Sequence, residues 1–376
     1  MKLKLKTAEF QNMVARAIKG ASCNSNLAIT QMMAIELTDN KLTLTTTDNS
    51  NYLYVSKDKV VGDNFYAVVY MDKFSKLISK LTCDEMTIEV NRDSKKDLDT
   101  LVIHGNGKYI IELPYDEDGE LVEFPDPLGT EDEPEFIEAD TKLSLIKLML
   151  STAKPSLMTG TKVPQYTGYY VGKNIVATDT YKICSIDVEM LEEPVIIPAE
   201  YLDLLEAMEY EDIHIKYSAE EGIIIFSTPD VTVYGHSLEG IEDYKIDAIL
   251  SVVEQPYPSS CKIEKSALMQ MLERLSLFVD TYDKNSVYLT FTKEGMEISN
   301  KRDKGSEIIP YKESVDFAPF TCCIDINLFR TQVKAYQSEI IEVLYGQEGR
   351  IKFVDGNVRQ IIALADDDRF EEGEDE

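Results

Sequence analysis

Several sequence signatures of enzymes are missing from this chain of 376 residues. It contains no GxxxxGK[ST] phosphate loop, no GxGxxG dinucleotide fingerprint and no HExxH metal motif. Its three histidines, His104, His214 and His236, lie in separate strand-like stretches, without the spacing that suggests a Ser/His/Asp triad. Tryptophan is absent as well. We therefore expect a protein without catalytic residues, bound metal or cofactor.

Long apolar runs are also absent. A run such as 222–226 has the length of a strand, far below the ~18 apolar residues that suggest a membrane helix. Residues 1–6 alternate charge and leucine like a strand and lack the apolar block of a secretion signal. The six cysteines show no CxxC spacing, which favours free thiols in a reducing compartment. We expect a cytoplasmic, nucleoid-associated protein without a membrane partner.

The chain repeats one pattern three times. A strand, a turn and a second strand recur, with the turn at Asp48, Asp179 and Asn300. A helix-like segment begins at Met71, Pro198 and Ile326, and the strand after it begins at Met86, Ile213 and Ile341. In both sets the starts are 127 and 128 residues apart. An amphipathic helix near residues 7, 141 and 265 opens each repeat.

A period of this length matches a whole domain and is too long for a solenoid repeat. We predict an α+β protein of three tandem domains of one fold, each with two helices and antiparallel sheets. The predicted boundaries are 1–125, 126–245 and 246–365, followed by an acidic, disordered tail at 366–376. The stretches 115–140 and 238–262, which contain prolines, are expected to be linkers.

Basic residues are scarce, with 38 Lys and Arg against 68 Asp and Glu and a net charge of −30. Such a chain repels nucleic acid on average, so DNA binding requires that the basic residues be gathered on one surface. The helix windows 71–81, 141–155 and 326–337 hold 3, 3 and 2 basic residues against 1, 0 and 0 acidic ones.

For any one helix, lysines on a solvated face explain this pattern, but three such windows in a strongly acidic chain favour a surface for a polyanion. The candidate DNA-binding residues are Arg16, Lys19, Lys73, Lys76, Lys80, Lys142, Lys147, Lys154, Arg330 and Lys334.

One motif links the chain to a known family. Residues 176–183, V-A-T-D-T-Y-K-I, resemble the V-A-T-D-G-H-R-L motif of the bacterial replicative sliding clamp, the β subunit of DNA polymerase III. Weaker similarities are residues 42–48 to L-T-A-T-D and 241–244 to F-P-x-Y. The resemblance covers most of residues 1–365, and its divergence suggests a phage or mobile-element version.

The resemblance implies a head-to-tail homodimer that closes a ring of six domains around duplex DNA. Such a ring slides without sequence specificity and tethers a DNA polymerase, and a clamp loader is a further expected partner. A clamp-like decoy that binds replication proteins without encircling DNA is an alternative. An enzyme on an unrelated α+β fold is another, and it predicts a cleft of titratable groups.

The resemblance also implies a partner-peptide pocket and a dimer interface. By motif, the pocket comprises Tyr166, Thr178, Thr180, Tyr181, Lys182, Ile183, Glu242, Ile246, Ile361, Ile362, Ala363, Leu364 and Ala365. By position, the interface comprises Tyr109, Ile111, Leu277 and Phe278. Ordinary strand or core packing is the alternative for both sets. Glu242 replaces the proline of F-P-x-Y, and residues 363–365 replace M-P-M, so we expect a different, more basic peptide.

Overall fold

The computed structural model describes residues 1–21, 27–92, 99–116, 118–125, 127, 134–160, 162–279, 285–302 and 304–365. The predicted acidic tail therefore lies outside the described residues. Backbone contacts divide the chain into two compact units, Met1–Ile146 with Glu200–Ser237, and Lys147–Ala199 with Leu238–Glu376. This division cuts across the three predicted domains, whose boundaries stay a prediction.

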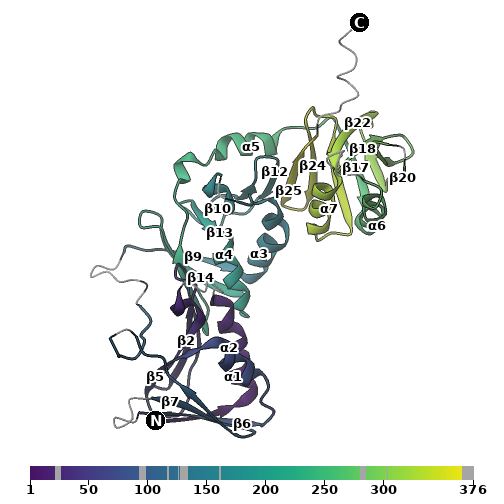
Figure 1. The fold of residues 1–376 in the computed structure, drawn as a ribbon. Helices are drawn as coiled ribbons and strands as arrows, with labels where there is room; N and C mark the ends of the chain where they lie inside the picture. The colour runs from purple at the N-terminus through teal and green to yellow at the C-terminus, as the bar shows by residue number, and fades with distance from the viewer. Residues whose placement is uncertain are drawn as a thin grey trace. The chain divides into compact units, whose positions relative to one another are not determined.

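The first unit contains a four-stranded sheet, β1-β6-β7-β8, and an eight-stranded sheet, β5-β2-β3-β4-β16-β15-β14-β9 (Figure 1). Its strands are β1 (Lys2–Lys6), β2 (Met32–Thr38), β3 (Lys41–Thr47), β4 (Tyr52–Lys57), β5 (Phe65–Tyr70), β6 (Glu85–Asn91), β7 (Thr100–His104), β8 (Lys108–Glu112), β9 (Ile137–Lys142), β14 (Asp212–Ser218), β15 (Ile223–Ser227) and β16 (Val231–His236). Its helices include α1 (Thr7–Ala17), α2 (Met71–Ser79) and most of α4 (Ala199–Leu204).

The second unit contains a nine-stranded sheet, β13-β10-β11-β12-β25-β24-β23-β17-β21, and a four-stranded sheet, β20-β19-β18-β22. Its strands are β10 (Gly168–Val171), β11 (Ile175–Thr178), β12 (Lys182–Ile186), β13 (Val195–Pro198), β17 (Ser259–Glu264), β18 (Ser286–Phe291), β19 (Met296–Asn300), β20 (Ser306–Ile309), β21 (Glu313–Val315), β22 (Phe320–Asp325), β23 (Ile340–Tyr345), β24 (Arg350–Asp355) and β25 (Val358–Ala363). Its helices include α5 (Ile246–Glu254), α6 (Lys265–Ser276) and α7 (Ile326–Ala335).

Shorter helical segments complete the fold. They are α3 (Leu143–Leu148), continued by a π-helical turn at Met149–Ala153, and 3₁₀ turns at Ile18–Gly20, Ala28–Gln31, Lys154–Ser156, Pro164–Thr167, Leu205–Ala207 and Ile241–Asp243. None of the helices in the described part of the chain is both long and apolar enough to cross a bilayer.

The helices and strands follow the apolar periodicity of the sequence. In α2, Met71, Phe74 and Ile78 are buried at spacings of three and four, which places them on one face. In β1, only Leu3 and Leu5 are buried, because alternate strand residues point to opposite sides of a sheet. The predicted patterns therefore correspond to real core faces.

An equivalent hydrogen bond lies near the start of each of the three predicted repeats. The backbone N–H of the first helical residue donates to a carbonyl just before the strand that pairs with the opening strand. The three bonds are Thr7 N to Asp84 O (3.0 Å), Leu143 N to Glu211 O (2.8 Å) and Lys265 N to Glu339 O (2.8 Å). Their acceptors are 127 and 128 residues apart, as the sequence spacing predicts.

Two of the three predicted turns are built alike. In each, the Oδ1 atom of Asp48 or Asp179 accepts hydrogen bonds of 2.9 and 2.7 Å from the N–H groups two and three residues later. The residue after the aspartate, Asn49 or Thr180, is left-handed, with φ of 84° and 78°. The third turn differs, because Asn300 Oδ1 accepts from the N–H of Lys304, four residues on.

Successive repeats are joined by the same strand pairing within each unit. In the first unit β4 pairs with β16, and Leu53 lies opposite Val233. In the second unit β12 pairs with β25, and Cys184 lies opposite Gln360. Leu53 and Cys184 hold equivalent positions, since each pairs inside its hairpin with the residue two before the turn aspartate. The two junctions therefore share one register.

The structure corrects three details of the sequence interpretation. The window 141–155 is not one helix, because Lys142 ends β9 and α3 begins only at Leu143. The predicted linker 238–262 contains α5, whose apolar residues recur at helical spacing. The helix predicted over 71–81 ends at Ser79, so Lys80 is its C-terminal cap residue.

Candidate functional site

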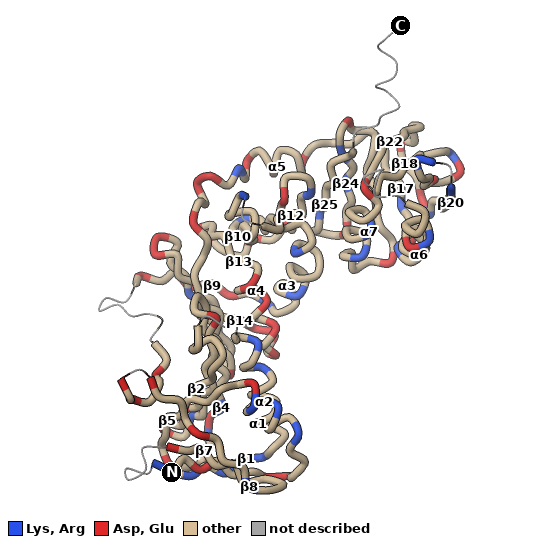
Figure 2. The backbone as a smooth tube through the Cα atoms, in the orientation of Figure 1, with Lys and Arg blue, Asp and Glu red and all other residues tan. Residues whose placement is uncertain are grey.

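Four of the candidate DNA-binding residues are exposed lysines on or next to helices: Lys73, Lys80, Lys147 and Lys334. Within the described ranges none of the four forms an ion pair. Figure 2 shows how unevenly the blue Lys and Arg positions are distributed along the chain. These four ammonium groups are therefore free to attract an anion such as a phosphate.

Other candidates have partners within the chain. Lys76 is paired with Asp72 one helical turn earlier, and Lys142 is paired with Asp212 across the β9–β14 ladder. The hydrogen bond and charge of Asp212 raise the pKa of Lys142. The guanidinium of Arg330 lies 3.4 Å from Ser276 Oγ, and Lys154 is exposed.

Arg16 and Lys19 are bound by the segment around α4 in the same unit. Arg16 Nε donates to Ala207 O at 2.7 Å, and its Nη1 is 2.7 Å from Asp230 Oδ2. Lys19 Nζ lies 3.3 Å from a carboxylate oxygen of Glu206. Only 12% of the Arg16 side chain is exposed. These contacts hold the first helix to the next repeat.

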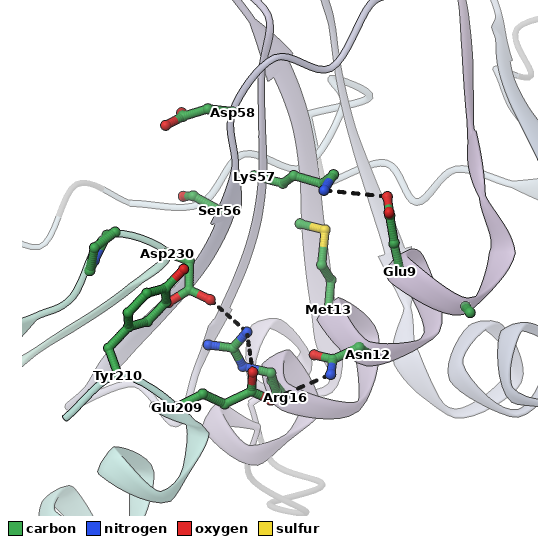
Figure 3. A pocket seen from close by; sticks show the side chains of 12 residues that line it. Glu9, Asn12, Met13, Arg16, Ser56, Lys57, Asp58, Glu209, Tyr210 and Asp230 are labelled. Atoms are coloured by element: carbon green, nitrogen blue, oxygen red, sulfur yellow. Dashed lines mark hydrogen bonds and ion pairs between the residues drawn. The ribbon is translucent and has the colours of Figure 1, made fainter.

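Arg16 also lines a pocket of the first unit, shown in Figure 3. Three ion pairs lie in its wall, Arg16 with Asp230 and with Glu209, and Lys57 with Glu9, and Asn12 donates to Glu209. The buried Nη2 atom of Arg16 has no hydrogen-bond partner among the described residues. The carboxylates around it make this pocket a poor site for phosphate.

A second candidate site is an apolar cluster on the second unit. Its buried members are Val176, Ile196 and Tyr244, and its half-buried members are Tyr166, Tyr170, Ile183, Leu238, Ile241, Ile246, Ile249 and Leu250. The rings of Tyr166 and Tyr170 lie 5.0 and 5.2 Å from that of Tyr244. Burial, followed by the two neighbouring tyrosines, raises the pKa of Tyr244. Because most members keep part of their surface in water, the cluster is open to a ligand.

The structure brings three of the thirteen predicted pocket residues into this cluster. Tyr166, Ile183 and Ile246 belong to it, and Ile183 pairs with Ile361 across the β12–β25 junction. The N–H of Ala363 donates to the carbonyl of Tyr181 at 2.8 Å. Of the other predicted members, Thr178 ends β11, Thr180 lies in the turn that follows, Lys182 begins β12, and Glu242 lies in the 3₁₀ turn.

Three predicted pocket residues point elsewhere. Ile362 is a fully buried member of the main core formed by α6, α7 and their sheets, and Leu364 packs against that core. The N–H of Ala365 donates to Cys323 O at 2.8 Å, which attaches it to β22. Lys182 is nearly buried, and its Nζ donates to Pro155 O at 2.6 Å, whereas Tyr181 is 68% exposed.

Sequence reasoning missed several cluster members, notably Tyr170, Tyr244, Ile249 and Leu250. The spacing of Ile246, Ile249, Leu250 and Val253 is that of an amphipathic helix and was the available signal. The prolines at 256 and 258 obscured it, because they favoured a linker.

The predicted interface residues lie near two sheet edges with no strand partner among the described residues. Tyr109 and Ile111 are half-buried on β8, and the residue between them, Ile110, is 61% exposed. Leu277 and Phe278, which follow α6, are 79% and 52% exposed. Ile308 on the edge strand β20 is 50% exposed and was missed from the sequence.

Comparison with solved structures identifies the fold. The DNA polymerase sliding clamp from Bacillus subtilis matches with a TM-score of 0.82 and 18% identity over 98% of this chain and 99% of that one. DNA polymerase III subunit β from Borrelia burgdorferi gives 0.82 and 17% over 97% and 98%. The β subunit from Streptococcus pyogenes gives 0.81 and 16% over 98% and 100%.

Comparison by sequence finds no match, either to a family model or to a curated protein. The structural matches cover nearly the whole chain, and they confirm the predicted fold class. The chain has the fold of the bacterial β sliding clamps.

Proposed function

We propose that this protein is a DNA sliding clamp, a ring-shaped homodimer that encircles duplex DNA and tethers a replicative polymerase. The observation that carries the proposal is the match to β clamps over 97–98% of the chain at TM-scores of 0.81–0.82. The proposed role is a processivity factor in DNA replication, so no catalysis is needed. A cytoplasmic, nucleoid-associated location follows from this role.

The strand pairing supports ring closure by a second copy. Each junction inside the chain joins the last strand of one hairpin to the last strand of the next repeat's sheet. The third repeat offers β20 and the first offers β8, and both are edge strands. An unpaired edge with exposed isoleucines is a template for another chain. Applying the shared register places Glu307 of one copy opposite Tyr109 of the other.

Side-chain positions support the same interface. Counted from the start of α1 and α6, Leu277 corresponds to Lys19, which contacts the segment after α4. In a dimer Leu277 would thus meet the partner's segment after α2. A groove between α1 and α2, lined by Val14, Ile18 and Ile78 among others, offers apolar surface there. Burial of the exposed Leu277 and Phe278 would stabilise the ring.

The DNA surface we propose is carried by four exposed lysines, Lys73, Lys80, Lys147 and Lys334. They supply positive charge and have no carboxylate partner among the residues that the structure describes. Lys76, Lys142, Lys154 and Arg330 add to it, whereas Arg16 and Lys19 act mainly in holding the first junction together. Contacts of lysine to phosphates carry no sequence information, which suits sliding.

The apolar cluster is the proposed docking site for partner peptides, including those of a polymerase and a clamp loader. Its tyrosines and aliphatic side chains provide anchoring pockets. The segment that crosses the cluster is mostly acidic. It carries a single exposed lysine, Lys245, against the exposed acids Glu239, Glu242, Asp243 and Asp247. This charge supports a peptide with apolar anchors and basic flanks.

The first experiment measures the mass in solution by light scattering over a range of concentrations. A value near twice 42.6 kDa is expected for the closed ring. The second experiment assembles the dimer in the presence of nicked circular DNA and washes it at high salt. A topological ring stays on circular DNA and leaves after linearisation. A monomer at all concentrations, or equal loss from circular and linear DNA, would overturn the proposal.

A further inference from the structure

Helix α5 is too short to be stable by itself. It has nine residues, and no side chain caps its N-terminus. Isolated helices of this length are marginal in water, so α5 must be held by contacts with the rest of the unit. It packs against β12 and β25, the two strands of the junction beside the apolar cluster.

The first part of α5 forms a wall of the apolar cluster. Ile246, Ile249 and Leu250 lie at spacings of three and four and are all half-buried there. Nearby, Asp247 is close enough to the Tyr170 phenol to raise its pKa, after the larger effect of burial. The position of the helix therefore sets the width of the proposed peptide pocket.

The last part of α5 is held by a buried lysine. Lys352, on β24, is 8% exposed, and its Nζ donates to the carbonyl of Val253 at 2.6 Å. The C-terminal end of a helix leaves its last carbonyls without hydrogen-bond donors and carries partial negative charge. An ammonium group at that end donates to a carbonyl and also compensates the charge. The same Nζ lies 5.7 Å from the ring centroid of Tyr257, within cation–π range.

This lysine is held in an unfavourable place. Burial, followed by the nearby Arg359, lowers its pKa, while Glu254 acts in the opposite direction. Burying a charge carries a cost that an apolar side chain would avoid. The contact to the helix end compensates, which argues for a role in placing α5.

A neighbouring contact fixes the segment that follows the helix. Gln347 Nε2 donates to Pro256 O at 2.7 Å. Gly346 has φ of 94°, and a Cβ atom there would come within 2.6 Å of Pro258. Residues 253–258 are thus attached to the β23–β24 hairpin at several points, and Lys352 contacts the helix itself.

We propose that Lys352 is a positioning residue for partner binding: it holds the C-terminal end of α5 and thereby sets the wall that α5 contributes to the peptide pocket. This inference rests on the proposed docking role of the apolar cluster. Lys352 itself does not contact the peptide. Its effect on affinity passes through the helix.

The test compares Lys352→Met, which keeps the stem and removes the charge, with Lys352→Arg, which keeps a cation. The probe is a fluorescein-labelled decapeptide with a Leu-Phe anchor pair flanked by lysines, and affinity is read by anisotropy. Hydrogen exchange of residues 246–254 is measured in parallel. We expect about tenfold weaker binding and about tenfold faster exchange for Lys352→Met, the scale of losing one charged hydrogen bond, and partial recovery for Lys352→Arg.

The matched control is Lys262→Met on β17 of the same sheet, where the lysine side chain is 41% exposed and paired with Glu313. It should change neither readout. Dimer mass and thermal melting check that each variant folds. Equal binding and equal exchange in Lys352→Met and wild type would overturn the role of Lys352. A wild type that forms the ring but binds no peptide would instead overturn the proposed pocket, and the inference with it.

Discussion

At the scale of single residues, Thr180 departs most clearly from the sliding-clamp motif that residues 176–183 resemble. It occupies the glycine position of V-A-T-D-G-H-R-L and is left-handed, with φ of 78°. A left-handed conformation is unfavourable for side chains with a Cβ and especially for branched ones. The hydrogen bonds of Asp179 and Thr178 hold the turn in place despite this cost.

Replacing Thr180 by glycine should therefore stabilise the protein. We expect a gain of about 1 kcal/mol, the left-handed penalty reduced by the greater freedom of glycine in the unfolded chain. Urea unfolding measures it. Asn49→Gly, in the equivalent turn at φ of 84°, should gain less, because asparagine tolerates this conformation. Equal gains would contradict the explanation.

Arg16 illustrates how a basic residue can have a structural role. Replacing it by methionine removes the bonds to Ala207 and Asp230 from a largely buried position. We expect a loss of about 2 kcal/mol in the free energy of unfolding. The dependence of DNA binding on salt should stay as in the wild type. A changed slope of log K against log salt, with an unchanged free energy of unfolding, would instead assign Arg16 to the DNA-binding surface.

Glu307 gives a residue-scale dependence on pH. Arg274 holds it with two hydrogen bonds of 2.8 and 2.5 Å and lowers the pKa of its carboxyl below 4.5. The unfolded chain then binds the carboxyl proton more readily than the folded chain does. The stabilisation by the Arg274–Glu307 pair is therefore complete above pH 4.5 and is lost as the pH falls. Melting curves of wild type and Arg274→Met should differ at pH 7 and converge in acid.

At the scale of elements, the helices differ in how much of their charge is available. The lysines of α3 and α7 that we assign to DNA have no carboxylate partner among the described residues. Helix α4, which opens with the exposed Glu200, and the turn after it, which contains Glu206, are acidic. The proposed DNA surface is therefore uneven from repeat to repeat.

Substitution of Lys147 and Lys334 by glutamine should weaken DNA binding in a salt-dependent way. Removing one lysine–phosphate pair reduces the slope of log K against log salt by about 0.9. Anisotropy of a labelled duplex at several salt concentrations measures the slope. The control is Lys216→Gln on β14, where the lysine is paired with Glu138. No change of slope in the double variant would place DNA elsewhere.

At the scale of the whole molecule, the two intrachain junctions predict the register of the proposed junction between copies. Both use the same register, so the proposed contact between copies has a defined alignment. In it, Ser306 lies opposite Ile110, as Ile183 lies opposite Ile361 inside the chain. The ring therefore needs no new type of contact.

The double variant Ile110→Cys with Ser306→Cys should form a disulfide between copies on mild oxidation. Directly paired residues of adjacent strands bring their Cβ atoms within reach of such a bond. Non-reducing electrophoresis should show covalent dimers. Ile110→Cys with Glu307→Cys is one residue out of register, and its side chains point to opposite faces. Equal cross-linking in the two variants would reject the alignment.

The sequence by itself determined the three repeats, the turns and the fold class. These depend on local spacing: strand alternation, helical periodicity and the aspartate that closes two of the three turns. The spacing between landmarks is kept even where residue identity between the repeats is low. A strand or helix moved by one residue would turn its apolar face to water.

Only the tertiary structure decided which basic side chains pair with carboxylates within the described chain and which remain available to a ligand. Arg16 and Lys73 look alike in the sequence, but Asp230, 214 residues away, binds the first. The apolar cluster around Tyr244 likewise depends on residues brought together from β10 to α5. Such assignments follow from long-range packing, which sets burial and distance and which no local pattern records.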